Sequence, residues 1–360
     1  MTLFIGLMSG TSADGMDAAL VDFAQGPVLI DALCLPYSAT FRRQLRQLAV
    51  SETAGILQIA ELDRAIAVHS VSAVQQLLER NQLSAADIRA IGSHGHTLRH
   101  RSQPDGFSWQ IGDPSWIAEH TGITCIADFR RRDIAAGGHG APLVPAFHQQ
   151  ALSSEQPRMV LNIGGIANLT VLPHGTRPLL GFDTGPGNAL LDDWCQQQLN
   201  CSCDAGGRLA AQGRIIPERL QRLLAHPYFM LPPPKSTGRE VFNLSLLGNV
   251  GAESPADILA TLTALTTESV CQAVRAYGHS RGELLVCGGG VHNDFMLQQL
   301  RAALPQHEVK SSANAGIDPD WLEAMAFAWL AWRTQQQLSG NAPQVTGAAG
   351  DRILGGIYPA

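Results

Sequence analysis

Short apolar runs alternate along the chain with longer segments in which apolar residues recur at helical spacing. Three apolar runs open the chain and predict β-strands, at residues 3–8, 17–23 and 28–35. A helix is predicted next, because apolar residues recur at near-helical spacing at Ile59, Leu62, Ile66, Val74 and Leu77. Further strands are expected at 88–95, 124–129, 158–165, 167–173, 178–182, 283–290 and 352–359, and helices at 188–198, 256–277, 294–304 and 319–337. The pattern predicts an α/β fold with mixed sheets, because the first strands follow one another as hairpins do.

One arrangement occurs twice, about half a chain apart. The run GLMSGTSADGMDAALVDF at 6–23 reads as a strand, a turn of Gly, Ser and Thr, and a second strand; LNIGGIANLTVLP at 161–173 repeats this design. Two similar α/β domains that face each other across a cleft are therefore expected. We expect the first domain to comprise residues 1–130 with a C-terminal tail from about 340 to 360, and the second to comprise 131–339. The loop GGHGAP at 137–142 marks the approximate boundary.

Amino-acid composition and charge argue against two classes of protein, disordered chains and nucleic-acid binders. The chain has 360 residues, 45% of them hydrophobic and 16% charged, so it can bury large cores and is not of the disordered class. A net charge of −6 provides no general basic field for nucleic acid. The local run Arg130–Arg132 is flanked by Asp128 and Asp133, which suits a small anionic ligand or internal ion pairs better than a duplex.

Cysteine usage and the N-terminal residues bear on the compartment. Seven cysteines are spread without framework spacing, and Cys195, Cys201 and Cys203 form their only cluster, without a C-x-x-C pair. This pattern favours neither a disulfide scaffold nor zinc. Met1 leads straight into the first strand, and no apolar run is long enough to span a bilayer. We expect a cytoplasmic protein without a membrane partner.

Five glycine-rich stretches, most of them following predicted strands, require a common explanation: SGTSADG, GSHGHT, NIGGIAN, DTGPGN and CGGGVHN. A single stretch of this kind is as well explained by an ordinary turn. Five together indicate a nucleotide and a second ligand, because glycine lets a ligand approach the main chain. The Walker pattern, the dinucleotide GxGxxG fingerprint after the first strand and the protein-kinase motifs are all missing. A phosphate cradle made of paired hairpins remains, the arrangement of the actin, hexokinase and heat-shock-70 superfamily.

A closer resemblance is carried by an ordered set of motifs. The chain contains GLMSGTSADGMD, GSHGHTLRH, QIGDPSWIAE, ADFRRRDIAAGGHGAPLVPAFH, LNIGGIANLT, FDTGPGNALLDDW, PPPKSTGREVFN, CGGGVHN, DPDWLEAMAFAWLA and GDRILGGIYP, in this order. In this it resembles the anhydro-N-acetylmuramic acid kinases of bacterial cell-wall recycling. The resemblance implies two ribonuclease-H-like α/β domains with a deep interdomain cleft, and a homodimer. It also implies that 1,6-anhydro-N-acetylmuramic acid is opened by water at C1 and phosphorylated on O6 by ATP, giving N-acetylmuramic acid 6-phosphate.

The resemblance assigns candidate catalytic carboxylates. Asp183, in DTGPGN, follows the predicted strand 178–182 and is the expected base for the attacking water; for a lone Asp before Thr-Gly, turn capping would be the ordinary interpretation. Glu323 is the candidate second carboxylate, on a helix whose neighbours Met325 and Phe327 indicate burial. A dedicated acid is not required, because the leaving O6 is also the nucleophile for phosphoryl transfer.

ATP and Mg²⁺ are the implied cofactors. The residues expected to bind ATP come from the two hairpins and from the CGGGVHN motif: Gly10, Thr11, Ser12, Ala13, Asp14, Gly15, Met16, Asp17, Asn162, Gly164, Gly165, Gly288, Gly289 and Gly290. Magnesium is expected through the phosphates, and its protein ligands stay open among Asp14, Asp17 and Asp183, each acting through water. Met8 stands where much of the superfamily has a carboxylate.

For the sugar, the resemblance implies a polar wall of His94, His96, Asp128, Arg130 and Asp133. Arginine suits the lactyl carboxylate, and an internal ion-pair network is the alternative interpretation of this group. Two positions depart from the commoner family pattern, because His96 and His139 stand where Gln is usual. Imidazole cannot present an amide's donor and acceptor together, which affects affinity and pH dependence rather than the reaction class.

Two other functions compete with this hypothesis. A kinase for a plain sugar or amino sugar would not open an anhydro bridge, and the pairing of ADFRRRDIAAGG with DTGPGN speaks against it. An actin-like filament or a heat-shock-70-like ATP switch would use the same fold. Beyond Gln337 only a short tail follows the nucleotide motifs, which leaves no room for a peptide-binding domain.

Overall fold

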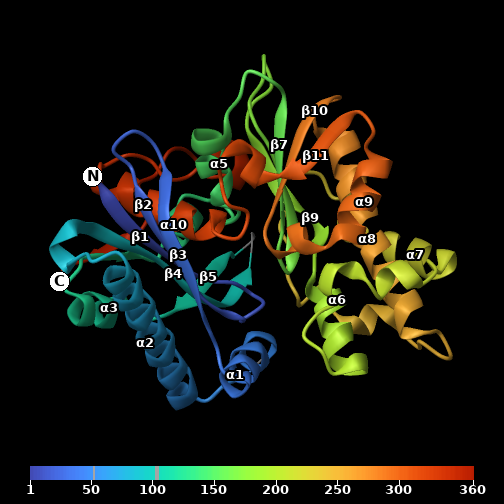
Figure 1. Ribbon diagram of the computed structural model, residues 1–360, viewed down its shortest axis with the longest axis horizontal. Coiled ribbons are helices and arrows are strands. Elements are labelled where there is room, and N and C mark those ends of the chain that lie inside the picture. The colour runs from blue at the N-terminus through green and yellow to red at the C-terminus, as the bar shows by residue number, and fades with distance from the viewer. Residues whose placement is uncertain (52, 102–104) are drawn as a thin grey trace. The chain divides into compact units, whose positions relative to one another are not determined.

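The computed structural model describes residues 1–51, 53–101 and 105–360, and the chain divides into two compact units (Figure 1). The first unit comprises Met1–Ala151 and Trp321–Ala360, and the second comprises Leu152–Asp320. The first unit thus extends beyond residue 130, where the sequence suggested a boundary, and it takes up the chain again at Trp321 rather than near 340. The reason is packing: the helix after Trp321 lies against strands of the first unit.

The first unit is built on a mixed sheet. Its strands are β1 (Leu3–Ser9), β2 (Gly15–Asp22), β3 (Val28–Pro36), β4 (Ile88–Arg101), β5 (Phe107–Ile111), β6 (Cys125–Ala127) and β12 (Gly356–Tyr358). They lie in the order β12-β6-β4-β1-β2-β3, with β5 paired to β4. Its helices are α1 (Ala39–Val50), α2 (Ile56–Arg80), α3 (Pro114–Thr121), α4 (Arg131–Ala135), α5 (Val144–Leu152, ending at the unit boundary), α10 (Leu322–Gln335) and α11 (Pro343–Thr346), with a 3-10 turn at Ala85–Asp87.

Helices cover both faces of this sheet. Alternate residues of β1, among them Ile5 and Leu7, pack in one apolar core with Ile66 and Val74 of α2. On the other face α10 lies so close that a Cβ added at Gly6 would stand 1.8 Å from the Ala324 carbonyl oxygen, and one at Gly92 would stand 2.0 Å from that of Phe327. Gly6 and Gly92 are register partners on β1 and β4, so a glycine pair makes room for the helix.

The second unit is built on a five-stranded sheet, in the order β11-β10-β7-β8-β9. Its strands are β7 (Arg158–Ile163), β8 (Ile166–Val171), β9 (Leu180–Pro186), β10 (Gly282–Cys287) and β11 (His307–Ser311). Its helices are α6 (Ala189–Trp194), α7 (Pro217–Leu224), α8 (Pro255–Tyr277) and α9 (Asp294–Ala303), with a π-helical turn at Cys195–Leu199 and 3-10 turns at Ala205–Gly207, Ala210–Gln212, Pro227–Met230, Leu244–Leu247, Gly289–His292 and Ser312–Ala315.

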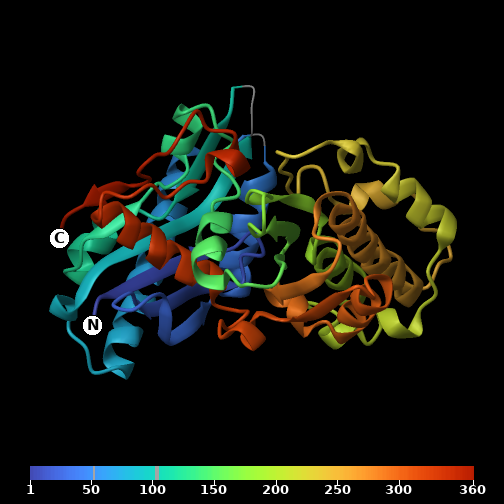
Figure 2. The ribbon, with the colours of Figure 1, turned by 90° about the horizontal axis from the view of Figure 1, so that it is seen from above.

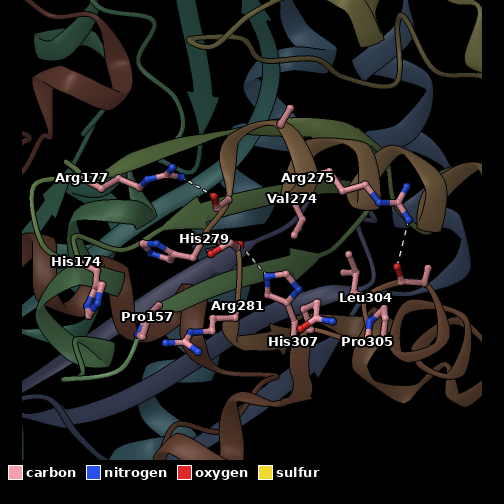
Figure 3. A pocket seen from close by; sticks show the side chains of 15 residues that line it. Pro157, His174, Arg177, Val274, Arg275, His279, Arg281, Leu304, Pro305 and His307 are labelled. Atoms are coloured by element: carbon pink, nitrogen blue, oxygen red, sulfur yellow. Dashed lines mark hydrogen bonds between the residues drawn. The ribbon is translucent and has the colours of Figure 1, made fainter.

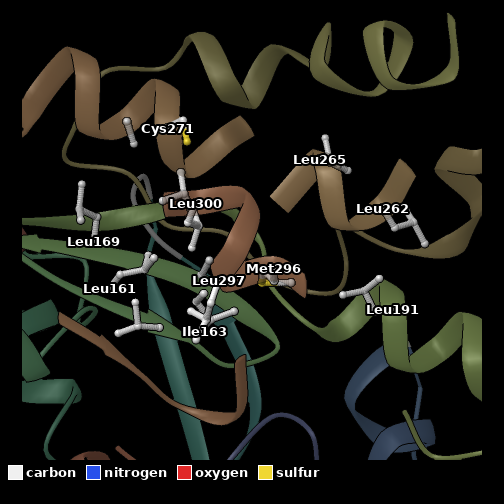
Figure 4. Close-up of a cluster of buried hydrophobic side chains, with 14 of the residues drawn as sticks. Leu161, Ile163, Leu169, Leu191, Leu262, Leu265, Cys271, Met296, Leu297 and Leu300 are labelled. Atoms are coloured by element: carbon white, nitrogen blue, oxygen red, sulfur yellow. The ribbon is translucent and has the colours of Figure 1, made fainter. Parts of the chain in front are cut away.

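A single buried cluster joins this sheet to its helices (Figure 4). Leu161 and Ile163 of β7 point toward Leu297 and Leu300 of α9, and Leu262 of α8 belongs to the same cluster. Most of α8 is buried, which explains why its sequence is apolar around much of its circumference rather than on one stripe. At about 25 cal/mol per Å² of apolar surface, burial of this kind is the main stabilising term for the unit.

The two sheets share one topology. In the first unit β1, β2 and β3 run antiparallel in sequence, and β4 and then β6 join the other side of β1 in parallel. In the second unit β7, β8 and β9 repeat the antiparallel part, and β10 and β11 repeat the parallel part. The prediction of two similar α/β domains of ribonuclease-H-like topology is confirmed. Both ends of the chain lie in the first unit, where β12 pairs with β6 (Figure 2).

Most of the predicted elements are confirmed, including the hairpins at both repeats and the helices α2, α8, α9 and α10. The pattern missed the helices α1 and α3 and the strands β5 and β11. The two strands have five residues each, and so short a strand carries little periodicity. Within the described residues, no helix combines the length and apolarity needed to cross a bilayer.

Candidate functional site

The first hairpin turn joins β1 to β2 and lies in the first unit. Ala13 adopts a positive φ of 53°, and its N–H donates to the Gly10 carbonyl oxygen at 3.0 Å, so the turn is closed by its own backbone. Arg46 of α1 donates to the Ser12 carbonyl oxygen at 2.7 and 3.0 Å, and Arg42 forms an ion pair with Asp14. These contacts place Arg46 beside a turn of backbone amides, which is favourable for an anion, whereas Asp14 offsets the charge of Arg42.

The predicted ATP residues of this hairpin divide by burial. The side chains of Thr11 and Asp14 are exposed, and those of Ala13 and Met16 are part of the apolar core. A Cβ added at Gly10 would meet only the Ser12 hydroxyl, at 3.8 Å, so the space there is open. One added at Gly15 would stand 2.6 Å from the Cys34 sulfur, so that glycine serves strand packing.

The second hairpin turn and the CGGGVHN motif lie together in the second unit. Asn162 is the register partner of Cys287, and a Cβ at Gly288 would stand 2.2 Å from the Asn162 side-chain oxygen. Gly164 accepts a hydrogen bond on its carbonyl oxygen from the Asn188 N–H at 2.8 Å, and the Gly165 carbonyl accepts from residues 187 and 189. At Gly164 and Gly289 an added Cβ would meet no atom closer than 3.7 Å, which leaves both open to a ligand, whereas Gly290 is packed against Ile163.

Asp183 lies on β9, opposite Asn168 of β8, and its side chain is half-buried. One carboxylate oxygen accepts from the Thr237 N–H at 2.9 Å. The Asp183 N–H donates to the Lys235 carbonyl oxygen at 3.2 Å, and the Tyr228 hydroxyl donates to the Asp183 carbonyl oxygen at 2.7 Å. The segment 228–237 therefore contacts the N–H, the carbonyl oxygen and the carboxylate of Asp183.

Lys235 is a functional candidate that the sequence analysis did not assign. Its side chain is 9% exposed, its Nζ donates to the Tyr228 carbonyl oxygen at 3.2 Å, and it stands 4.6 Å from the Tyr228 ring centroid. Burial lowers the pKa of Lys235, and the nearby charge of Asp183 opposes that shift. An ammonium group beside the carboxylate favours its charged form, which is the form a base requires.

An ion pair anchors the segment that carries Lys235 and Thr237. Arg239 donates from one nitrogen to both carboxylate oxygens of Asp193 on α6, at 2.9 and 3.0 Å. The signal for these residues was present, because Lys235 and Thr237 belong to the PPPKSTGREVFN motif. No comparable signal marked Tyr228, since its contact to Asp183 joins residues 45 positions apart.

The residues expected to contact the sugar fall into separate arrangements within the first unit. His94 is 5% exposed, and its Nε2 accepts from the Arg130 Nε at 3.1 Å. Its Nδ1 must therefore carry the proton, which it donates to the Gly95 carbonyl oxygen at 3.0 Å. Burial and the Arg130 charge hold the pKa of His94 well below its usual range, so this histidine is neutral. Arg130 also donates to the Gly140 carbonyl oxygen at 2.8 Å.

His96 contacts a different partner. Its Nδ1 lies 3.0 Å from the Ser9 hydroxyl, which in turn accepts from the Tyr37 hydroxyl at 3.0 Å. Ser9 is the last residue of β1, directly before the first hairpin turn. Burial lowers the pKa of His96 to about 4. The departure from the usual glutamine thus places a neutral imidazole beneath the turn.

Asp128 and Asp133 differ in their availability. Asp128 has a positive φ of 61°, is half-buried, and lies 3.4 Å from the Arg131 guanidinium; burial raises its pKa. Asp133 is fully buried and accepts from the Gly140 N–H at 2.8 Å and from the side chains of Asn341 and Thr346 at 2.9 and 2.8 Å. Its contacts are those of a residue that joins two loops, and binding of the sugar by Asp133 stays a prediction.

Glu323 lies in the first turn of α10 and is half-buried. The expected burial of this helix is confirmed. One turn further along, the Phe327 ring packs against His94 with ring centroids 4.6 Å apart. Because residues four apart share a helix face, Glu323 lies on the side of α10 that carries the His94 contact. Its role as a second carboxylate stays a prediction.

The donor set for a metal consists of scattered carboxylates. In the described part of the chain, no three His, Cys, Asp or Glu side chains lie together as ligands of one ion. Asp17 lies opposite Met8 and Cys34 on neighbouring strands. Mg²⁺ bound to a nucleotide usually needs only one or two carboxylates besides phosphates and water, so this set fits Mg²⁺ carried by ATP rather than a protein cage.

Comparisons with known proteins decide between the functions that this geometry leaves open. The family model for anhydro-N-acetylmuramic acid kinase matches residues 2–360. The chain belongs to this family. It is 51% identical over 368 residues to the anhydro-N-acetylmuramic acid kinase of Xanthomonas oryzae, with 99% of this chain and 97% of that protein covered. It is 48% identical to that of Shewanella sediminis, with 99% and 98% covered.

Among solved structures, the chain is similar to the activator of the 2-hydroxyisocaproyl-CoA dehydratase from Clostridium difficile. The identity is 12% and the TM-score 0.47, with 94% of this chain and 98% of that chain covered. At this level the likeness adds nothing to the topology described above. Membership of the anhydro-N-acetylmuramic acid kinase family makes the chain a phosphotransferase, and it rests on the full-length sequence matches.

Proposed function

We propose that this chain carries out the reaction of its family: it adds water to C1 of 1,6-anhydro-N-acetylmuramic acid, breaks the C1–O6 bond and transfers the γ-phosphoryl group of ATP to O6. The products are N-acetylmuramic acid 6-phosphate, ADP and one proton. The full-length match to the family and the half-buried Asp183 on β9 support this reaction. The role in cell-wall recycling follows from the substrate.

Asp183 is the general base in this proposal. The Thr237 N–H on one carboxylate oxygen fixes its orientation, and the carboxylate takes the proton from water. Lys235 keeps the carboxylate charged before the reaction and stabilises its position. As C1–O6 breaks, the oxygen of O6 gains negative charge while it bonds to phosphorus, so no protein acid has to protonate it.

ATP is positioned by backbone rather than by a lysine loop. The open glycines Gly10, Gly164 and Gly289 are the points of close approach, and Arg46 adds positive charge beside the first turn. Bound Mg²⁺ would neutralise charge on the phosphates, with Asp17 or Asp183 contacting it through water. Arg130 faces the lactyl carboxylate, and Glu323 faces the sugar.

The proposal also includes the compartment of the enzyme and its oligomeric state. We place it in the cytoplasm, because its substrate and ATP meet there, and we expect it to act as a homodimer. Size-exclusion chromatography with light scattering measures the oligomeric state: a mass of about twice the 38.4 kDa of one chain supports a homodimer.

The reaction is tested by ADP release with 1,6-anhydro-N-acetylmuramic acid and with N-acetylmuramic acid, for the wild type and Asp183→Asn. We expect turnover of the anhydro sugar alone and a loss of about 10³-fold in the variant, which is the range for removal of a general base. Glu240→Gln is the matched control, since it removes an exposed carboxylate of the same unit. Equal phosphorylation of the open sugar, with little loss in Asp183→Asn, would make the chain a plain sugar kinase instead.

A further inference from the structure

A pocket of about 750 Å³ lies within the second unit, and Asp183 is not among the residues that line it (Figure 3). Its walls are the turn after β8, the C-terminal ends of α8 and α9, and the segments that lead into β10 and β11. None of the residues that line it is Asp or Glu. Six of them are arginine or histidine: His174, Arg177, Arg275, His279, Arg281 and His307.

Two of the arginines have a structural explanation. Arg177 donates to the Tyr277 carbonyl oxygen at 2.6 Å, at the end of α8, and Arg275 donates to the Ala303 carbonyl oxygen at 3.1 Å, at the end of α9. The C-terminus of a helix carries partial negative charge, so these two cations offset helix ends. If all the basic residues were used in this way, the pocket would need no ligand.

Arg281 is not used in this way. Its side chain is exposed, and in the described part of the chain it forms no hydrogen bond or ion pair. The carboxylates nearest in sequence are already engaged: Glu283 pairs with Arg158 and Lys310, and Glu308 also pairs with Lys310. The positive charge of Arg281 is therefore left uncompensated at the pocket.

His307 adds a second, independent observation. Its Nε2 donates to the His279 carbonyl oxygen at 2.8 Å, so in the neutral ring Nδ1 is an acceptor. That Nδ1 is buried and has no hydrogen-bond partner among the described residues. A buried nitrogen without a partner is destabilising by about 1–3 kcal/mol. Because this nitrogen has no exposed surface, the ring must turn toward the pocket before Nδ1 can share a proton with an oxygen of a bound anion.

We propose that this pocket binds a small phosphate-bearing molecule, with the phosphate between Arg281 and His307. Guanidinium suits phosphate because its planar donors match two phosphate oxygens. The apolar side chains of Val274 and Leu304 form part of the wall, so a short carbon skeleton attached to the phosphate can be covered as well. Inorganic phosphate and a phosphate monoester share the chemistry that the pocket recognises.

The test is a titration of protein labelled with ¹³C in its histidine rings, with inorganic phosphate and, separately, glycerol 3-phosphate, at constant ionic strength set by chloride. The Cε1–H resonance of His307 is assigned with His307→Gln. We expect a saturable shift of this resonance, tighter for glycerol 3-phosphate if the apolar wall contributes. In Arg281→Gln the apparent Kd should rise at least tenfold, whereas Arg89→Gln, which removes an exposed arginine of the first unit, should leave it within twofold.

The proposal is overturned if His307 shows no saturable shift in the wild type, or if Arg281→Gln gives the same titration curve. Tighter binding of inorganic phosphate than of glycerol 3-phosphate would support the anion site and assign it to the free ion. Because the signal is local to His307, phosphate bound near the hairpin turns does not produce it. Kinase turnover at saturating substrates should be unchanged in Arg281→Gln, so this test and that of Asp183 can fail separately.

Discussion

At the residue scale, the candidate base is defined by what surrounds it. Asp183 is a single carboxylate in a chain with 31 acidic residues, and its sequence context alone resembles a capped turn. Its backbone and side chain are held by Tyr228, Lys235 and Thr237, which come from a segment about 50 residues later. This support gives Asp183 a fixed orientation that an ordinary turn aspartate lacks.

Replacing Lys235 by Met should make the reaction more sensitive to acid. Loss of the ammonium group removes the attraction that favours the charged carboxylate, so the base becomes easier to protonate and the acid limb of kcat/KM moves to higher pH. The pH profile of kcat/KM measures this shift. Lys235→Arg keeps the charge and should retain the wild-type limb. An unmoved limb in the Met variant would mean that Lys235 does not influence the base.

At the element scale, α10 is positioned by the two glycines beneath it. Gly6 and Gly92 lie side by side on β1 and β4, and the backbone of α10 occupies the space that their side chains would need. This close contact attaches the helix to the first unit, and with it Glu323 and the Phe327 ring that packs on His94. A helix expected in the second domain therefore belongs to the first.

Gly92→Ala should destabilise the first unit. The added methyl group would stand 2.0 Å from the Phe327 carbonyl oxygen, so α10 must move or the sheet must distort, at a cost of about 1–3 kcal/mol or more. Urea unfolding measures the loss. Gly55→Ala is the control, because a Cβ there meets no atom within 4 Å. Equal stability of Gly92→Ala and the wild type would contradict the close contact described here.

At the scale of the whole molecule, buried histidines are concentrated in the first unit. Burial lowers the pKa of His96 and of His100 to about 4 and that of His148 to about 3, and burial with the Arg130 charge lowers the pKa of His94. In the unfolded chain these rings bind protons below about pH 6.5. Between pH 6.5 and 4 the unfolded state therefore binds more protons than the folded state, and stability falls as the pH falls.

The urea midpoint should accordingly be constant near pH 7 and above, as far as these rings determine it, and should decrease steadily from pH 6.5 to 4.5. In His96→Gln the free energy of unfolding should fall less steeply with decreasing pH, by up to about 1.4 kcal/mol per pH unit for one proton. His120→Gln, at an exposed ring, should keep the wild-type slope. A His96→Gln slope equal to that of the wild type would show that His96 is not neutral in the folded protein.

The sequence by itself determined the α/β class, the doubled hairpin design and, through its ordered motifs, the family. These features are local: strand periodicity, glycine-rich turns and short motifs each depend on residues close together in the chain.

Only the tertiary structure decided which residues surround the candidate groups. It paired His96 with Ser9, His94 with Arg130 and Lys235 with Asp183, and it engaged Asp133 between two loops. It also separated the open glycines, such as Gly10, from those packed against protein. The physical reason is that burial and pairing arise between residues 36 to 208 positions apart, and no local pattern records which of them the fold brings together.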